Sequence, residues 1–391
     1  MCLRLHLDFV TACCECALVM PVRLDQVPAQ ASRPVRPGRW LWFAGLPLFL
    51  LLLGVGGMSL FGAQLLHQRP IHFLGLAVGV PLLGWCLLGF GRVFLYLGQQ
   101  QVAEGWDIAR EEDLAHKLQR GRRVQRVLAA SHHCAAGITE EAPGLRLQRI
   151  LTQVLADLVP ILEQAPVDTP LAVLFEIESA LPEAVSRQAW RRAWSLSGIR
   201  QSVVPVSSCG LDALDRWLDR RIADQALLLV VATQFMPQRP EGKADVAIGM
   251  LLTNRTTYQA LPCKACLHRP EQAREANADA LLYAVRQALE WVPLNAQSIE
   301  QIWRAGVDTE GGAQLLAVLE KVPIQSTHQQ RINDLDTSQG NPGRASPWLA
   351  IAAATQAIEC GVGSQFIFSG DGNGAQGLWC TVLTPVESFS K

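Results

Sequence analysis

Two long apolar stretches constrain this chain more than any other feature. Residues 40–62 (WLWFAGLPLFLLLLGVGGMSLFG) carry no charge, and residues 71–97 carry only Arg92. About 20 apolar residues in a helix cross a bilayer. The alternative, a buried helical hairpin of a soluble protein, seldom uses helices this long and charge-free. With the short connector AQLLHQRP between them, the stretches predict a transmembrane helical hairpin over residues 40–98.

The basic residues predict how this hairpin is oriented. Only Arg69 lies in the connector, whereas basic residues lie on both flanks, at Arg4, Arg23, Arg33, Arg36 and Arg39 before it and at Arg110, Lys117, Arg120, Arg122, Arg123 and Arg126 after it. Basic flanks stay in the cytoplasm. A signal peptide is the alternative, but about 39 residues precede the first stretch and no small-residue cleavage site follows. We expect a multi-pass protein with both termini cytoplasmic.

The leader, residues 1–39, and the overall composition add two expectations. Met20 opens a more ordinary stretch than Met1, so the start is expected at one or the other, and the cluster Cys13, Cys14 and Cys16 favours neither a metal nor a lipid anchor. The chain's 11 cysteines show no disulfide-framework spacing, which fits thiols in a reducing compartment. A net charge of −1 gives no indication of nucleic-acid binding.

Beyond the hairpin the pattern predicts a charged helix and then one α/β domain. Residues 99–140 are expected to be a juxtamembrane helix, running through Ala130, and a linker. Residues 141–391 alternate helical patterns with short apolar strands, and SVVPV and QALLLVVAT are typical of strands buried on both faces. We expect one long helix over residues 270–292, no strong element over residues 324–343, and no internal repeat.

The order of these motifs resembles the β-ketoacyl synthase branch of the thiolase-like superfamily. The matching segments are SSCGLDALDRWL, ADQALLLVVATQ, EGKADVAIGMLLTN, IWRAGVDTEGG, GNPGRASPWLAIAAATQAI and SGDGNGAQGLWCTVL. The resemblance covers roughly residues 140–388 and is one of order and spacing. It implies a layered αβαβα domain, a nucleophilic cysteine at Cys209 and, by analogy with the family, a homodimer.

The family's two histidines are missing from the positions that match. Ala305 and Asn341 stand there instead, and Ala305 has no hydrogen-bond donor for an oxyanion, a loss that typically costs about 100-fold or more in rate. Asn341 retains an amide that can donate. Cys209 at a helix start would have its thiolate favoured, but a small buried residue fits that turn equally well. Without the histidines, Cys209 is expected to mark ancestry rather than activity.

Several other motifs are weighed as sites and set aside, so that no metal and no cofactor is expected. Cys263, Cys266 and His268 in CKACLH lack a fourth zinc ligand and favour a strand edge with buried thiols. The loop SGDGNGAQG lacks the Lys-Ser/Thr and the following helix of a phosphate loop and favours a tight turn. The remaining candidates are His132, His133 and Cys134, expected in a loop, Asp212, Asp215 and Asp219, expected in solvated ion pairs, and Trp190 with Trp194, expected in the core or in the wall of a groove.

These observations lead to three functional hypotheses. The first is a membrane-anchored, non-catalytic thiolase-like protein that serves as a binding or adapter platform. A general similarity to lipase-adapter accessory proteins of type VI secretion implies a secreted effector as partner and the bacterial inner membrane as location. The second is a membrane-bound acyltransferase or condensing enzyme that uses Cys209. The third is an inner-membrane immunity or assembly protein.

Overall fold

The structure is a computed structural model that describes residues 22–36, 38, 40–62, 69–134, 141–238, 242–292, 294–322, 324, 332–371 and 377–386. The cysteine cluster at residues 13–16 and both candidate start methionines lie outside the described residues. Two compact units are distinguished. One is Leu24–His116, and the other combines Met1–Arg23 with Lys117–Lys391.

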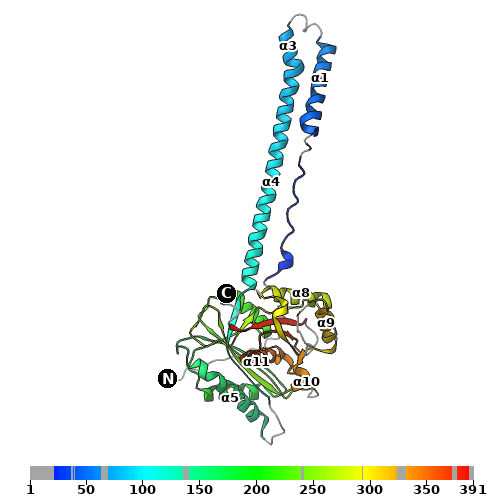
Figure 1. Ribbon diagram of the computed structural model, residues 1–391. Coiled ribbons are helices and arrows are strands. Elements are labelled where there is room, and N and C mark those ends of the chain that lie inside the picture. Colours follow the sequence, from blue (N-terminus) through cyan, green and yellow to red (C-terminus); the bar gives the residue numbers. More distant parts are fainter. Residues whose placement is uncertain are drawn as a thin grey trace. The chain divides into compact units, whose positions relative to one another are not determined.

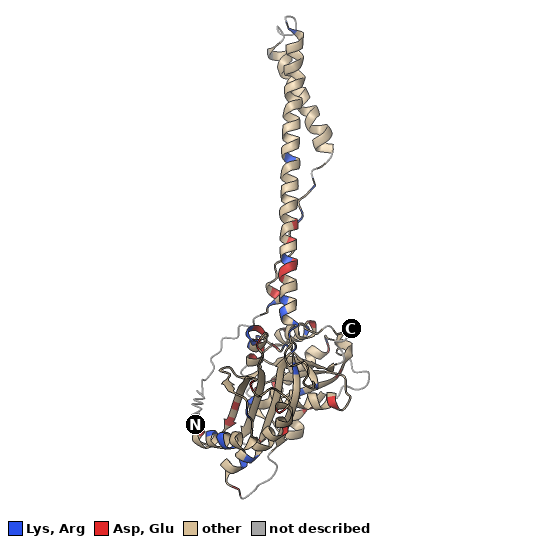
Figure 2. Ribbon diagram, turned by 90° about the vertical axis from the view of Figure 1, so that its left-hand side faces the viewer, with Lys and Arg blue, Asp and Glu red and all other residues tan. Residues whose placement is uncertain are grey.

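The first unit contains the two predicted apolar helices. A short π-helical segment η2 (Leu41–Gly45) leads into α1 (Leu46–Phe61), and α3 (Pro70–Leu74) and η3 (Gly75–Gly79) lead into the long helix α4 (Val80–Gly121). Both continuous helical stretches, Leu41–Leu60 and Pro70–Gly121, are long and apolar enough to cross a membrane. Figure 2 shows few charges on their apolar parts and a concentration of charges farther along α4.

The two helices meet where small residues allow close approach. A Cβ atom on Gly54 would lie 2.4 Å from the Ala77 carbonyl oxygen and from the Pro81 ring. The indole of Trp85 donates a 2.8 Å hydrogen bond to the Trp42 carbonyl oxygen, within the π-helical segment. Small residues at such crossings are typical of helix pairs in membranes.

The polar part of α4 is paired with the segment that precedes the hairpin. Asp107 accepts hydrogen bonds from the Ala31 amide at 2.9 Å and from the Arg33 guanidinium at 2.8 Å. Arg110 donates to the Pro28 carbonyl oxygen at 2.7 Å. Residues 28–33 therefore lie beside the charged turns of α4.

The second unit is the α/β domain, and it begins earlier than predicted. The juxtamembrane helix was expected to continue through Ala130, but α4 ends at Gly121 and residues 124–134 form strand β1 (Val124–Cys134). β1 pairs with β5 (Val246–Asn254) and β6 (Ala265–His268). Burial explains the difference, because Val127 and Leu128 are fully buried and belong to a sheet.

The domain consists of two halves that share one topology. After β1, the first half runs through α5 (Pro143–Leu162), β2 (Leu171–Ser179), α6 (Glu183–Ser197), β3 (Val203–Pro205), α7 (Gly210–Arg220), β4 (Leu227–Phe235) and β5. After β6, the second half runs through β7 (Glu271–Gln272), α8 (Ala278–Glu290), η4 (Ala296–Ser298), β8 (Ile299–Ala305), α9 (Thr309–Leu319), β9 (Ile332–Asp334), α10 (Leu335–Gln339), η5 (Gly343–Ala345), α11 (Ser346–Glu359), β10 (Ser364–Ser369) and β11 (Trp379–Thr384).

Strand order and direction make the repeat explicit. The halves have the orders β3-β2-β4-β5-β1 and β9-β8-β10-β11-β6. In each, the first three strands are parallel, the fourth is antiparallel to the third, and the last is antiparallel to the fourth. β1 and β6 then join the halves as an antiparallel pair. The expectation of no internal repeat was wrong. The two halves repeat the order and direction of their strands.

Three apolar clusters show how the layers pack. α5 and α6 cover one face of the first half, α8 and α9 cover one face of the second, and α7 and α11 lie between strands of both halves. This gives five layers in the order αβαβα (Figure 1). The predicted layered α/β class is confirmed.

Local signals placed most of these elements correctly. α5 begins at Pro143 and buries one apolar stripe, and α6 ends at Gly198, whose φ of 71° suits glycine. β4 is buried along its whole length, as predicted for a strand covered on both faces, and β5 is equally buried.

Three local expectations were wrong. β3 was predicted to be covered on both faces, but it is an edge strand with Val204 41% exposed. The long helix expected over residues 270–292 begins only at Ala278, because buried Glu271 and Gln272 pair with β11. The region expected to lack a strong element contains β9 and α10, stabilised where the Asp334 side chain caps α10.

Candidate active site

Cys209 lies at the strand-to-helix turn predicted for it. It is the N-cap residue of α7, it is exposed, and its backbone is extended, with φ −132° and ψ 160°. Gly210 follows with φ 58°, a conformation that glycine adopts without steric cost. The sharp turn is therefore built by glycine and presents the cysteine at its edge.

A carboxylate lies behind this turn. Glu176, in β2, accepts hydrogen bonds from the Gly210 amide and from the Trp348 indole, the latter at 3.2 Å. Burial raises the pKa of Glu176, although these two donors oppose the rise. Sequence reasoning missed this residue. The available signal was a glutamate inside the apolar strand PLAVLFEIES.

The side-chain oxygen of Asn341 accepts hydrogen bonds from other residues of the domain. Its Oδ1 accepts a hydrogen bond from the Gly343 amide at 2.8 Å and another from Lys243 Nζ at 3.4 Å. Its carbonyl oxygen accepts from Gln234 Nε2 at 3.2 Å. These contacts fix the turn that leads into η5 and α11.

Ala305, at the other position expected for a histidine, is the buried last residue of β8. The two amides that follow it, of Gly306 and Val307, donate to the two carboxylate oxygens of Asp336 at 2.8 and 3.2 Å. Burial raises the pKa of Asp336, against the effect of both amides. Asp336 was also missed, since it lies in the region expected to lack structure.

The start of α11 contacts the neighbours of two of these positions. Trp348 donates to Glu176, the carboxylate that accepts from the amide of Gly210 beside Cys209. A Cβ atom on Gly306, next to Ala305, would lie 2.5 Å from Ser346 Oγ, and Ser346 Oγ itself donates to the Gly343 carbonyl oxygen at 2.5 Å. That Cys209, Ala305 and Asn341 form one site stays a prediction from the resemblance.

The electrostatics of the turns that follow Cys209 and Ala305 differ from those of a site that stabilises an oxyanion. Such a site holds unoccupied N–H donors toward the position where negative charge develops. Here the amides of Gly210, Gly306 and Val307 donate to Glu176 and Asp336, and the amide of Arg344 donates to Glu178 at 3.1 Å. The chain's own carboxylates occupy these donors, so a further anion would meet both occupied amides and negative charge.

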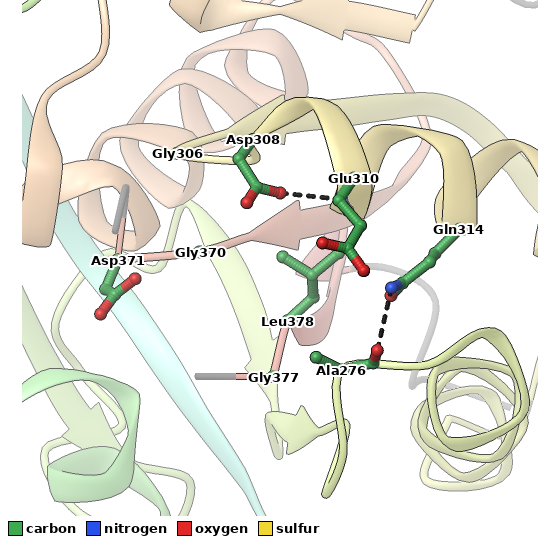
Figure 3. A pocket seen from close by; sticks show the side chains of 10 residues that line it. Ala276, Gly306, Asp308, Glu310, Gln314, Gly370, Asp371, Gly377 and Leu378 are labelled. Atoms are coloured by element: carbon green, nitrogen blue, oxygen red, sulfur yellow. Dashed lines mark hydrogen bonds between the residues drawn. The ribbon is translucent and has the colours of Figure 1, made fainter. Parts of the chain in front are cut away.

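A small pocket lies beside Gly306, at the start of α9. Figure 3 shows Asp308, Glu310 and Asp371 around it, together with glycine backbone at residues 306, 370 and 377. Asp308 caps α9 by accepting from the Gly311 amide at 2.8 Å, and Gln314 donates to the Ala276 carbonyl oxygen at 3.0 Å. The middle of the predicted glycine turn, residues 372–376, lies outside the described residues.

The motif CKACLH lies on and just before the central strand β6, so the expectation of a strand edge was wrong. His268 is buried, its Nε2 lies 3.2 Å from Thr384 Oγ1, and burial lowers its pKa to about 3. Among the described residues no group of three or more His, Cys, Asp or Glu side chains is arranged to hold a metal ion.

The histidines expected in a loop lie instead at the end of strand β1. His133 Nε2 lies 2.7 Å from Asp157, and Ser131 donates to the same carboxylate oxygen at 2.5 Å. The tryptophan pair is in the core as predicted, with the rings of Trp190 and Trp194 5.3 Å apart.

Solvated ion pairs were expected for the aspartates of α7, and this is correct for only some of them. Asp212 pairs with Arg216 at the surface. Asp215 is 1% exposed and forms a 2.6 Å ion pair with Arg269, which is equally buried and lies 3.0 Å from Asp219. Burial raises the pKa of Asp215 to about 6, opposed by Arg269. The arginine that explains this burial comes from a distant segment.

Comparisons with known proteins identify no family for this chain. No known family profile matches the chain, and no curated protein sequence matches it. Human mitochondrial 3-ketoacyl-CoA thiolase matches at a TM-score of 0.48 and 9% identity, over 68% of this chain and 100% of that one. Peroxisomal 3-ketoacyl-CoA thiolase of Saccharomyces cerevisiae matches at 0.48 and 13%, over 68% and 98%. An oxazolomycin ketosynthase domain of Streptomyces albus matches at 0.49 and 13%, over 67% and 95%.

The three matches have TM-scores of 0.48 to 0.49, which are too low to carry a conclusion about this chain. The described residues of this chain show five layers and two halves with the same strand order. The domain is a layered α/β fold by its own strand order, and identities of 9 to 13% carry no conclusion about its activity.

Proposed function

We propose that this chain is a membrane-anchored, non-catalytic thiolase-like protein that serves as a binding or adapter platform. The observation that carries the proposal is the occupation of the backbone donors around Cys209 and Ala305 by Glu176 and Asp336. Thioester chemistry needs donors for a developing oxyanion. Here the donors are satisfied internally, and Ala305 offers none in their place.

Exposure of the apolar helices supports the anchor. None of the apolar window of Leu41–Leu60 is buried, and only 6% of that of Pro70–Gly121 is buried. A core helix of a soluble protein would bury its apolar face, whereas 20 residues of helix match the roughly 30 Å thickness of a hydrocarbon core. A multi-pass anchor with cytoplasmic termini is proposed on this basis, with the bacterial inner membrane as its location.

Acylation of Cys209 tests the non-catalytic proposal. The purified full chain in detergent is incubated with decanoyl-coenzyme A, and the peptide that contains Cys209 is examined by mass spectrometry beside that of Cys209→Ser. We expect no acyl adduct on Cys209 above the level at the exposed Cys360. Stoichiometric acylation of Cys209 would overturn the proposal.

The condensing-enzyme alternative rests on one observation. Cys209 is exposed at the N-terminus of an 11-residue helix, where backbone amides and the helix dipole favour a thiolate. The acylation experiment decides between the two proposals, because an acyltransferase must form the adduct that a platform does not form.

The partner and the topology need separate tests. A link to type VI secretion, with an effector as partner, and the immunity or assembly role stay predictions from the sequence, as does the homodimer. Co-purification of a toxin encoded beside this protein, unchanged by Cys209→Ala, would support the adapter role. A reporter fused after Leu97 should be active only in the cytoplasm, and activity only in the periplasm would contradict the topology.

A further inference from the structure

Two cysteines at the seam between the two halves form a contact that the proposed function does not use. Cys263 is half-buried just before β6, and Cys266 is buried within it. The Cys263 and Cys266 side chains are in hydrogen-bonding contact, and the Cys263 thiol donates to the Ala265 carbonyl oxygen at 3.3 Å. The sequence C-K-A-C therefore brings two sulfurs together, although no metal site is built there.

An arginine from the other half faces this pair. Arg126, on β1, is the register partner of Cys266 and forms a hydrogen bond with the Cys263 side chain. Its guanidinium is fixed by donating to the carbonyl oxygens of Tyr258 at 3.2 Å and Leu261 at 2.8 Å. The carbonyl oxygens of the turn before Cys263 thus hold the Arg126 guanidinium beside Cys263.

The two thiols are differentiated by these surroundings. The contact with Cys266, together with Arg126, lowers the pKa of Cys263. The same contact and burial raise the pKa of Cys266. The thiolate is the nucleophilic form of cysteine, so these directions favour Cys263 as the attacking sulfur.

We propose that Cys263 and Cys266 are a redox-active dithiol that exchanges with a low-molecular-weight disulfide such as glutathione disulfide. The Cys263 thiolate attacks one sulfur of the disulfide and releases one glutathione thiolate, which takes a proton. The Cys266 thiol then loses its proton and attacks Cys263 Sγ, releasing the second glutathione. The chain is oxidised by two electrons to a Cys263–Cys266 disulfide, and the glutathione disulfide is reduced to two thiols.

The positions of the cysteines suit these separate roles. The half-buried Cys263 is the one that a soluble disulfide can reach, and the buried Cys266 is available only to its neighbour. The pair lies where β6 pairs with β1 of the first half and with β11 of the second. This inference stands independently of the proposed adapter role, because neither cysteine contributes to the site around Cys209.

Peptide mapping tests the proposal directly. Trypsin cleaves after Lys264 and so separates the two cysteines into the peptides TTYQALPCK and ACLHRPEQAR. The full chain in detergent is treated with glutathione disulfide at pH 7, quenched with iodoacetamide and digested. We expect these two peptides to be joined by a disulfide, and the bond to disappear after reduction. Absence of the joined peptides would overturn the proposal.

Variants assign the two roles. Cys266→Ser should accumulate one glutathione on Cys263, because the resolving thiol is gone, and Cys263→Ser should leave Cys266 unreacted. Cys360→Ser, which removes an exposed cysteine elsewhere, is the matched control and should behave as the wild type. A wild-type chain that retains glutathione on Cys263 as persistently as Cys266→Ser would contradict the resolving role.

The pH dependence of alkylation provides a readout that a structural role would not change. The labelling rate of Cys263 by iodoacetamide should reach half its maximum at a lower pH than that of Cys360, and Arg126→Met should move that midpoint upward. Labelling of Cys360 gives the reference within the same sample. An identical midpoint for Cys263 and Cys360 would show that Cys263 is an ordinary thiol.

Discussion

Strand β4 and helix α1 are both built from uncharged, mainly aliphatic residues, yet they have opposite environments. Every residue of β4 is buried between helices of two layers. In α1, Leu52 is 66% exposed and Leu60 is 79% exposed. The comparison shows that hydropathy predicts only that a segment avoids water. The fold shows whether other parts of the protein cover that segment. The exposed segment is the one proposed to be buried by lipid.

The largest expected effect comes from placing the same charge in both regions. Val230→Lys in β4 introduces an unpaired charge at a fully buried position and should unfold the domain, costing more than about 4 kcal/mol. Leu52→Lys should change domain stability by less than about 0.5 kcal/mol and weaken membrane insertion by about 3 kcal/mol. Denaturation in detergent and alkaline extraction of membranes measure the two effects. Equal destabilisation of the domain would contradict the distinction.

The next effect concerns the buried charges of the domain, which the hairpin lacks. Arg269→Met leaves Asp215 buried without its partner and should destabilise the domain by about 3 to 5 kcal/mol. Arg216→Met, which removes the surface pair with Asp212, should cost less than about 1 kcal/mol. Urea denaturation compares the two variants, and similar midpoints would show that the buried pair contributes no more than the surface pair.

A buried carboxylate should make the domain sensitive to pH. Burial raises the pKa of Glu271 from 4.5 to about 7, while the Trp291 indole, 2.8 Å away, opposes the rise. The folded state then holds this proton more tightly than the unfolded state, so the contribution of Glu271 to stability is full below pH 4.5 and is lost as pH rises through 7. The loss should reach about 2 to 3 kcal/mol. Glu271→Gln should flatten this decline in denaturation experiments between pH 4.5 and 8, and an unchanged slope would assign it to other groups.

The smallest effect tests how the hairpin packs. A side chain on Gly54 would collide with Ala77 and Pro81, whereas nothing lies within 4 Å of a Cβ on Gly56. Gly54→Leu should cost about 1 to 3 kcal/mol of helix packing, and Gly56→Leu should cost little. Hydrogen exchange of residues 41–60 in nanodiscs should be several-fold faster only in Gly54→Leu. Equal exchange in both variants would show that the crossing does not hold the hairpin.

The sequence predicted what depends on local pattern. Uninterrupted apolarity defined the two hairpin helices, helical spacing and Gly198 defined α5 and α6, and the glycine after Cys209 defined the turn at α7. Motif order also implied that Cys209, Ala305 and Asn341 occupy the site positions of the resembled family, which stays a prediction. These features follow from nearest neighbours along the chain or from motif order.

Tertiary structure decided what depends on distant partners. A glutamate in β2 and an aspartate in α10 occupy the amides at two turns far away in sequence, and Arg269 makes Asp215 a buried residue. From the alternating Asp and Arg residues of α7 alone, surface ion pairs were predicted. The sequence does not show which of these side chains the fold removes from water. Burial and hydrogen bonding are properties of the assembled layers, and they determine the chemistry of the site.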